Sequence, residues 1–72
     1  MSFIKRITDI TEKVGVKRGD HKIEPYGGHV LVWENLEEEQ LKKLAKELKT
    51  EFGKQAVIVE ENTIILRYQR RS

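Results

Sequence analysis

The stretch from Asn35 to Tyr68 contains one amphipathic helix followed at once by two apolar strands, and this order limits the possible folds more than any other feature of the chain. Asn35 stands three residues before Glu38, the capping-box spacing that predicts the start of a helix. Gly53 supplies the left-handed residue that commonly ends one, so we expect a helix over 36–52. The apolar residues of this segment recur at helical spacing and predict one buried face: Leu41, Leu44, Ala45, Leu48 and Phe52.

Two strands, 56–60 and 63–69, are predicted on either side of a tight turn at Glu61-Asn62, where asparagine tolerates the positive φ that such a turn needs. A register that pairs residue 60 with residue 63 decides which side chains share a face. One face then carries Val57, Val59, Ile64, Leu66 and Tyr68, and the other carries Ala56, Ile58, Ile65 and Arg67. Because both faces are largely apolar, we expect the second one to be covered by the N-terminal helix, a second copy or a partner.

The N-terminal segment predicts a first helix near 2–14. Ser2 is suited to the N-cap position, and Gly15 marks the stop. Apolar residues again follow at steps of three and four: Phe3, Ile4, Ile7, Ile10 and Val14. The polar face carries charges of both signs, which favours core packing over a membrane surface.

Residues 15–28 are irregular and contain four of the five glycines and the only proline. Loops of this length tend to be functional or disordered. Within the loop, Ile23 and Pro25 suggest a short extended piece near 21–24, suited to a sheet edge because proline cannot donate to a strand ladder. The chain then enters an apolar strand near 29–34.

These elements predict a small α+β fold in a single domain over residues 1–72, in the order α-β-α-β-β. We expect a three-stranded sheet packed by two helices, with the piece near 21–24 as an extra edge strand, the loop at 15–28 and a basic C-terminal tail at 69–72. The sequence leaves open whether the last strand lies between the other two or at an edge. The predicted core consists of Val30, Val32, Leu41, Leu44, Leu48, Val57, Val59, Ile64 and Leu66.

The residue types present argue against catalysis, metal sites and cofactors. The chain has no cysteine, which excludes disulfides and thiolate ligands. His21 and His29 stand eight residues apart and lack the paired spacing of a zinc site. Serine occurs only at Ser2 and Ser72, so a serine-histidine-acid arrangement is not expected. We therefore expect no enzyme activity, no metal and no cofactor.

Charge and hydropathy narrow the class of partner. No apolar run approaches the roughly 20 residues of a membrane span, so we expect a cytoplasmic protein without one. The net charge is only +2 although 36% of the residues are charged. Residues 1–33 carry six positive and four negative charges, residues 34–53 carry four and six, and residues 54–72 carry four and two. The two ends are therefore basic, while the central helix is mildly acidic.

The first hypothesis is a non-catalytic module that binds nucleic acid. Basic side chains can neutralise phosphates, and aromatic rings interleaved with them can stack on unpaired bases. The loop and the C-terminal end offer both kinds of residue. The predicted nucleic-acid-binding residues are Lys17, Arg18, His21, Lys22, Tyr26, Arg67, Arg70 and Arg71.

The alternative hypothesis is a protein-interaction module, such as a small regulator or inhibitor. An apolar second sheet face and an unpaired strand edge could accept a partner or a second copy as a homodimer. The predicted interface residues are Trp33, Ile58 and Ile65, since tryptophan is enriched at binding hot spots. The two hypotheses differ in salt dependence, because phosphate contacts weaken steeply with salt and an apolar interface responds little.

Overall fold

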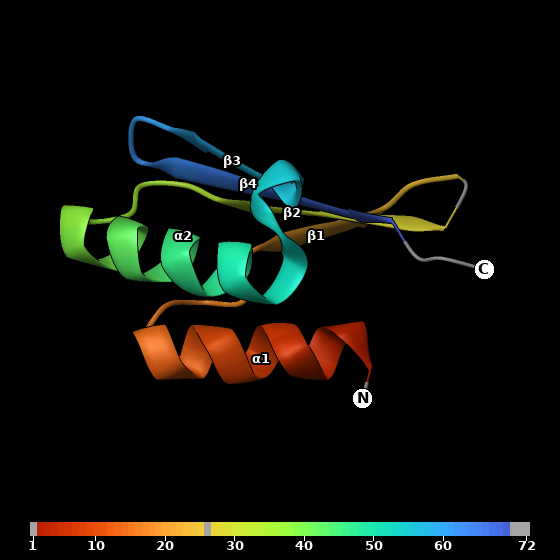
Figure 1. Cartoon of the computed structure of the whole chain (residues 1–72), viewed down its shortest axis with the longest axis horizontal. Coiled ribbons are helices and arrows are strands. Elements are labelled where there is room, and N and C mark those ends of the chain that lie inside the picture. Colours follow the sequence, from red (N-terminus) through yellow and green to blue (C-terminus); the bar gives the residue numbers. More distant parts are fainter. Residues whose placement is uncertain (1, 26, 70–72) are drawn as a thin grey trace.

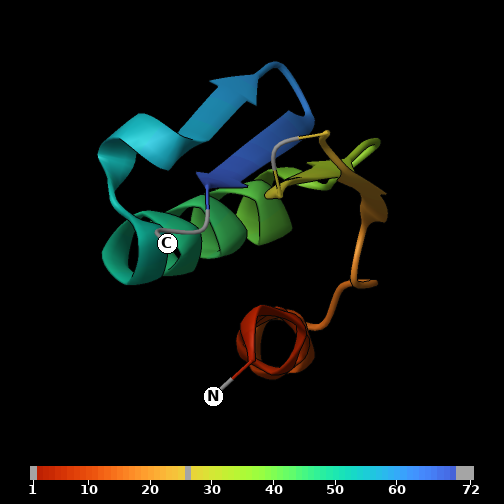
Figure 2. The same cartoon turned by 90° about the vertical axis from the view of Figure 1, so that its right-hand side faces the viewer.

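The computed structural model describes residues 2–25 and 27–69, which form a four-stranded antiparallel sheet with two helices on one side of it (Figure 1). Seen from the end, both helices lie on the same side of the strands (Figure 2). The elements in chain order are α1 (Phe3–Val14), β1 (Asp20–Ile23), β2 (Gly28–Trp33), α2 (Glu38–Phe52), the short 3₁₀ helix η1 (Lys54–Ala56), β3 (Val57–Glu60) and β4 (Thr63–Gln69). The predicted α+β class is confirmed, and so is the extra edge strand, which is β1.

The helix α1 forms as its sequence predicts. Ser2 is the N-cap, and its side-chain oxygen accepts a hydrogen bond from the backbone N–H of Lys5 at 3.2 Å. Gly15 ends the helix with φ of +87° and donates its N–H to the carbonyl of Thr11. Glycine reaches this left-handed conformation without a Cβ penalty, so both ends of α1 are encoded locally.

The predicted capping box at Asn35 is wrong, because α2 begins at Glu38 with Glu37 as an N-cap that makes no side-chain hydrogen bond. Asn35 instead adopts φ of +57° and turns the chain between strand and helix. The N–H of Leu36 donates to the carbonyl of Asn62 at 3.0 Å. Because Leu36 makes this bond to a distant turn, it lies outside the helix in which the capping box would have placed it.

The sheet order is β1-β2-β4-β3. The last strand, β4, therefore lies between β2 and β3, which precede and follow α2 in the chain. The predicted pairing of Glu60 with Thr63 is confirmed. In the turn, however, Glu61 takes the positive φ of +49° that was expected of Asn62. Because β2 and β3 both run antiparallel to β4, they are parallel to each other without being neighbours.

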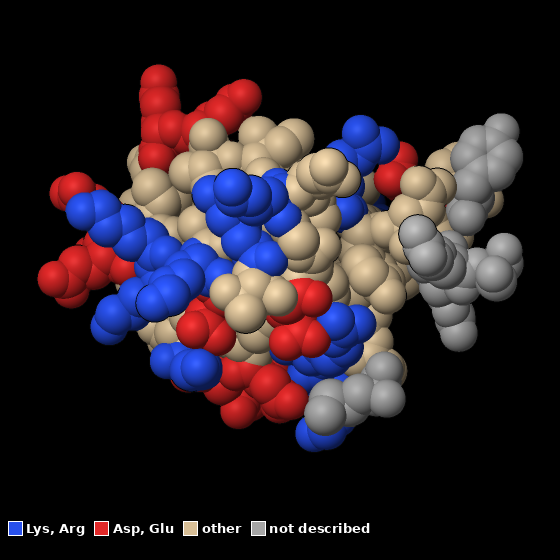
Figure 3. Space-filling model, in the orientation of Figure 1, with Lys and Arg blue, Asp and Glu red and all other residues tan. Residues whose placement is uncertain are grey.

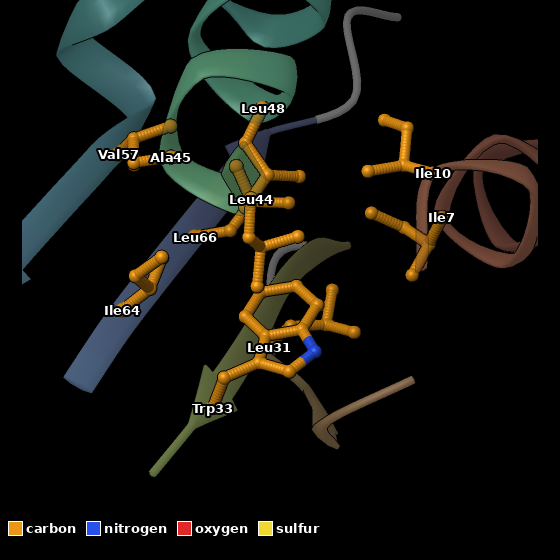
Figure 4. Close-up of a cluster of buried hydrophobic side chains, with 10 residues drawn as sticks. All are labelled: Ile7, Ile10, Leu31, Trp33, Leu44, Ala45, Leu48, Val57, Ile64 and Leu66. Carbon is orange, nitrogen blue, oxygen red and sulfur yellow. The ribbon is translucent and has the colours of Figure 1, made fainter. Parts of the chain in front are cut away.

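The core lies between the sheet and the helices (Figure 4), and its members are Ile7, Ile10, Leu31, Trp33, Leu44, Ala45, Leu48, Val57, Ile64 and Leu66. The prediction of Val30 and Val32 as core residues is wrong, since Leu31 and Trp33 face the helices instead. Every residue from 30 to 33 is apolar, so the strand pattern alone cannot select a face. The register decides it, because Leu31 pairs with the fully buried Leu66.

The prediction that Val59 belongs to the core is also wrong, because its side chain is 39% exposed. It shares the inner face with Ile64, as predicted. Its strand β3 is at the sheet edge, however, and only Val57 reaches under α2. Within the part of the chain that the structure describes, neither helix is long and apolar enough to cross a membrane.

Candidate functional site

The predicted nucleic-acid-binding residues lie in separate places. Lys17 and Arg18 are in the loop between α1 and β1, and both are exposed. His21 lies on the helix-facing side of the sheet, opposite Leu31. Lys22 and Arg67 lie on the other side, next to each other across Val30. Tyr26, Arg70 and Arg71 lie outside the described residues.

Arg67 is engaged within the chain, because its guanidinium forms an ion pair with Glu24 at 3.2 Å. Both side chains are substantially exposed, so the pair contributes little to stability. Lys22 and Arg67 together carry two positive charges on this side of the sheet, and the carboxylate of Glu24 nevertheless reduces their net charge to one. The structure therefore brings Lys22 and Arg67 together, but not with Lys17 and Arg18.

Trp33 is not at the surface where an interface residue was expected. It is 3% exposed, and its indole N–H donates to the carbonyl of Lys17 at 2.8 Å. This bond ties the loop to the sheet and borders a pocket of about 580 Å³. Lys17, Arg18, Asp20 and Glu34 all line that pocket, so charges of both signs surround it.

Four aromatic rings gather where α1, α2 and the sheet meet. Phe3 stacks on both His29 and Tyr68, which are partners on neighbouring strands, with ring centroids 4.5 Å and 4.7 Å away. Tyr68 also meets the edge of Phe52 at 5.3 Å. Tyr68 is therefore half-buried and engaged within the chain by Phe3 and Phe52.

His21 and His29 form a hydrogen bond beside this cluster, with 2.8 Å between Nε2 of His21 and Nδ1 of His29. One ring must donate while the other offers a lone pair, so the bond exists only while at least one imidazole is neutral. Partial burial lowers the pKa of His21 below its ordinary value, and the nearby positive charge of His29 and Arg18 lowers it further.

We expect this pair to make stability depend on pH. Because the pKa of His21 is lower in the folded than in the unfolded chain, the unfolded chain binds more protons as the pH falls. The stability that this difference in the pKa of His21 contributes is fully present above the unfolded pKa of about 6.5. It is lost as the pH falls through the pKa of His21 in the folded chain. Thermal melts from pH 7.5 to 5.5 should show a falling Tm, with a smaller fall in His21→Gln. If the Tm fell equally in the unmodified protein and in His21→Gln, protonation of the histidine pair would not be linked to folding.

A basic surface that the sequence reasoning missed runs along α2. Lys42, Lys46 and Lys49 follow at helical spacing, and Lys54 continues the row in η1; we call these four residues the lysine stripe. With Ala45 and Thr50 they line a shallow, open depression. Figure 3 shows basic side chains gathered over α2 and η1. The helical spacing of Lys42, Lys46 and Lys49 could have predicted this surface from the sequence. It was overlooked because residues 34–53 have a net negative charge.

Two of the four carboxylates of α2, those of Glu47 and Glu51, lie on the opposite flank and point to α1. Glu47 pairs with Lys13 at 3.2 Å, and Glu51 pairs with Arg6 at 2.6 Å. The hydrogen bond to Glu51 raises the pKa of Arg6 above its ordinary value. On the stripe, Lys42 pairs with Glu38 at 3.3 Å, whereas the other three lysines make no ion pair within residues 2–25 and 27–69. Packing against α1 thus holds Glu47 and Glu51 away from Lys46, Lys49 and Lys54.

The sheet surface away from the helices is the second candidate, and we call it the outer face. At its centre are Val30, Val32, Ile58 and Ile65, joined across strands because Val32 pairs with Ile65 and Ile65 pairs with Ile58. Three of these side chains are half-buried by their neighbours, and Ile58 is 43% exposed. Ile58 and Ile65 were both predicted as interface residues, and the structure brings them side by side.

Among the described residues, no group of three histidine, aspartate or glutamate side chains converges as metal ligands would. Comparison with known proteins adds no family: no family model matches the chain, and no curated protein or solved structure matches it significantly. The lysine stripe and the outer face are therefore the two surfaces that bear on function.

Proposed function

We propose that this protein is a non-catalytic module that binds the phosphate backbone of nucleic acid through the lysine stripe. The observation that carries the proposal is the separation of charges on α2. Since Glu47 and Glu51 are held by α1, they cannot neutralise the lysines of the other flank. Lys42 is paired with Glu38, but Lys46, Lys49 and Lys54 make no ion pair among the described residues. A row of such cations attracts a polyanion and releases its condensed counterions.

The dimensions of the stripe suit a nucleic-acid strand. An α-helix rises 1.5 Å per residue, so Lys42 and Lys49 are separated by about 10 Å along the axis. One strand of a duplex presents about three phosphates over that length, at about 3.4 Å per phosphate. Lysine is a flexible point charge, which fits contacts to phosphates rather than a rigid pattern of hydrogen bonds to base edges.

The aromatic residues support backbone recognition over base recognition. Phe3, Phe52 and Tyr68 pack against one another, and Trp33 is buried in the core. None of them lies in the stripe, and base-stacking platforms require exposed rings. We therefore expect binding that depends strongly on salt and weakly on sequence.

Neutralising two stripe lysines should flatten the salt dependence of binding. In Lys46→Gln/Lys49→Gln, the slope of log affinity against log salt should fall by about 2, since each phosphate contact contributes about 0.9 for a duplex. Fluorescence anisotropy with a labelled duplex from 20 to 200 mM salt measures this slope. Both lysines are exposed, so the fold should tolerate the change.

The matched control is Lys17→Gln/Arg18→Gln, which removes the same charge from the loop at the end of α1. We expect this variant to bind with a slope within about 0.5 of that of the unmodified protein, because two charges at a distant site make few of the contacts. A flattened slope in the loop variant alone would move the site to the loop predicted from sequence. Failure to bind any duplex or single strand at 20 mM salt would refute the proposal.

Protein recognition is the second candidate function, and the outer face is the observation that favours it. Helices cover only one side of the sheet, and the other side has four neighbouring aliphatic residues at its centre. Contiguous exposed apolar surface of this kind commonly marks an interface.

A further inference from the structure

The outer face carries opposite charges at diagonally opposite corners. At one corner, Lys22 of β1 stands beside the Arg67–Glu24 ion pair. At the other corner, Glu60 of β3 is followed by Glu61 in the turn. Lys22 and Glu60 lie on the two edge strands, on the same side of the sheet as the central aliphatic residues. The face is therefore apolar in the middle, with Lys22 at one corner and Glu60 at the diagonally opposite corner, while Asp20 lies on the same edge strand as Lys22, level with Ile65.

From this arrangement we propose that the outer face binds a second copy of this chain, around a two-fold axis that places Lys22 of each copy over Glu60 of the other. A two-fold contact brings the same patch of both copies together, so a surface must be complementary to itself. The outer face meets that condition because rotation exchanges its positive and negative corners while the apolar centres meet. This inference is independent of nucleic-acid binding, which was assigned to the flank of α2.

The geometry of the sheet fixes the approximate crossing angle of the two copies. Lys22 lies level with Arg67, and Glu60 lies level with Thr63, which comes four residues before Arg67 in β4. The corners are thus separated by about 13 Å along the strands and, over three strand spacings, by about 14 Å across them. The diagonal lies near 45° to the strands. A two-fold axis perpendicular to this diagonal crosses the strands of the two copies at about 90°, one of the two common angles of sheet packing.

The chemistry of the face favours a second copy over nucleic acid. Its centre is formed by β-branched aliphatic side chains, whereas single-stranded nucleic acid is held by aromatic platforms. Asp20, Glu24 and Glu60 all lie on this side of the sheet and would repel phosphates. In the proposed dimer, Glu60 instead attracts Lys22 of the other copy.

The first test is the mass in solution, measured by sedimentation equilibrium after nuclease treatment and a high-salt wash. The unmodified protein should approach twice its chain mass of 8.5 kDa at submillimolar concentration. Ile65→Lys places a charge in the centre of the interface and should leave only monomer. Lys46→Gln/Lys49→Gln should dimerise normally, so failure of the nucleic-acid proposal would not affect this result.

The second test uses charge reversal and needs no change in the apolar centre. Lys22→Glu and Glu60→Lys should each weaken the homodimer about tenfold or more, because two symmetric contacts become repulsive. An equimolar mixture of the two variants should recover dimer, since every pair in the mixed dimer is again attractive. Lys5→Glu, which makes the same charge change on α1, should dimerise normally.

Each unfavourable result overturns a stated part of the proposal. A monomeric unmodified protein at 1 mM would exclude the second copy and leave a different protein as the partner of the face. A dimer that persists in Ile65→Lys, with a normal melting transition, would place the interface elsewhere. Loss of dimer in both reversal variants without recovery on mixing would refute the pairing of Lys22 with Glu60.

Discussion

Leu44→Ala is expected to lower the free energy of unfolding by about 2–5 kcal/mol, the range for truncating a fully buried leucine. Leu44 is 0% exposed and extends from α2 into the space between the sheet and α1, near Leu31 and Leu66 (Figure 4). Alanine favours the helix by less than about 1 kcal/mol over leucine, so it cannot offset the cavity. Because a domain of this size has only about 3–5 kcal/mol of net stability, the variant should be largely unfolded at 37 °C.

Urea titration followed by circular dichroism measures this loss, and the neighbouring Lys43→Ala is the matched control. Lys43 is exposed on the same turn of α2, and its substitution should change stability by no more than about 0.5 kcal/mol. A midpoint for Leu44→Ala close to that of Lys43→Ala would mean that α1 does not pack on α2 as described. That result would also remove the basis for the separation of charges on α2.

The elements that short-range rules encode could be predicted from the sequence. The helix α1 has its cap and its stop within its own segment, at Ser2 and Gly15. The hairpin of β3 and β4 has its register set by a two-residue turn, at which residues 60 and 63 pair. In both cases the deciding contacts join residues a few positions apart, so no tertiary information was needed.

The errors occurred where a distant contact decides between local alternatives. Asn35 has a capping-box sequence, but the bond from Leu36 to Asn62 turns the chain there instead. The face that β2 presents to the core depends on its pairing with β4, because its pattern is apolar on both faces. Local patterns set the number and type of the elements, and pairing across the sheet set which side chains they bury.

The candidate site shows the same division. The aliphatic second face, with Ile58 and Ile65, followed from strand alternation alone. The lysine stripe did not, because residues 34–53 carry four positive and six negative charges and so have an acidic total. Only the packing of α1 shows that Glu47 and Glu51 are engaged on one flank while the lysines remain on the other. A total of charges over a helix therefore says little about the surface that the helix presents.

Trp33→Ala should be the other strongly destabilising change, with an expected loss of about 3–5 kcal/mol. The indole fills the core beside Leu31 and donates to the carbonyl of Lys17. It also lies against Gly19, where a Cβ would come within 2.8 Å of the ring and where φ is +89°. Removing the ring leaves a cavity and frees the loop from the sheet, so stability and loop order should be lost together.

Trp33→Phe separates these two effects. Phenylalanine keeps much of the apolar volume but has no N–H, so the carbonyl of Lys17 loses its donor, at a cost of about 1–3 kcal/mol. Since Trp33 is the only tryptophan, the melts of both variants must be followed by circular dichroism. If the lysine stripe binds nucleic acid, Trp33→Phe should bind a duplex with the normal salt slope at a temperature where it is folded. A slope flattened as in Lys46→Gln/Lys49→Gln would instead show that the loop carrying Lys17 and Arg18 makes the phosphate contacts, and that Trp33 acts in binding by holding that loop in place.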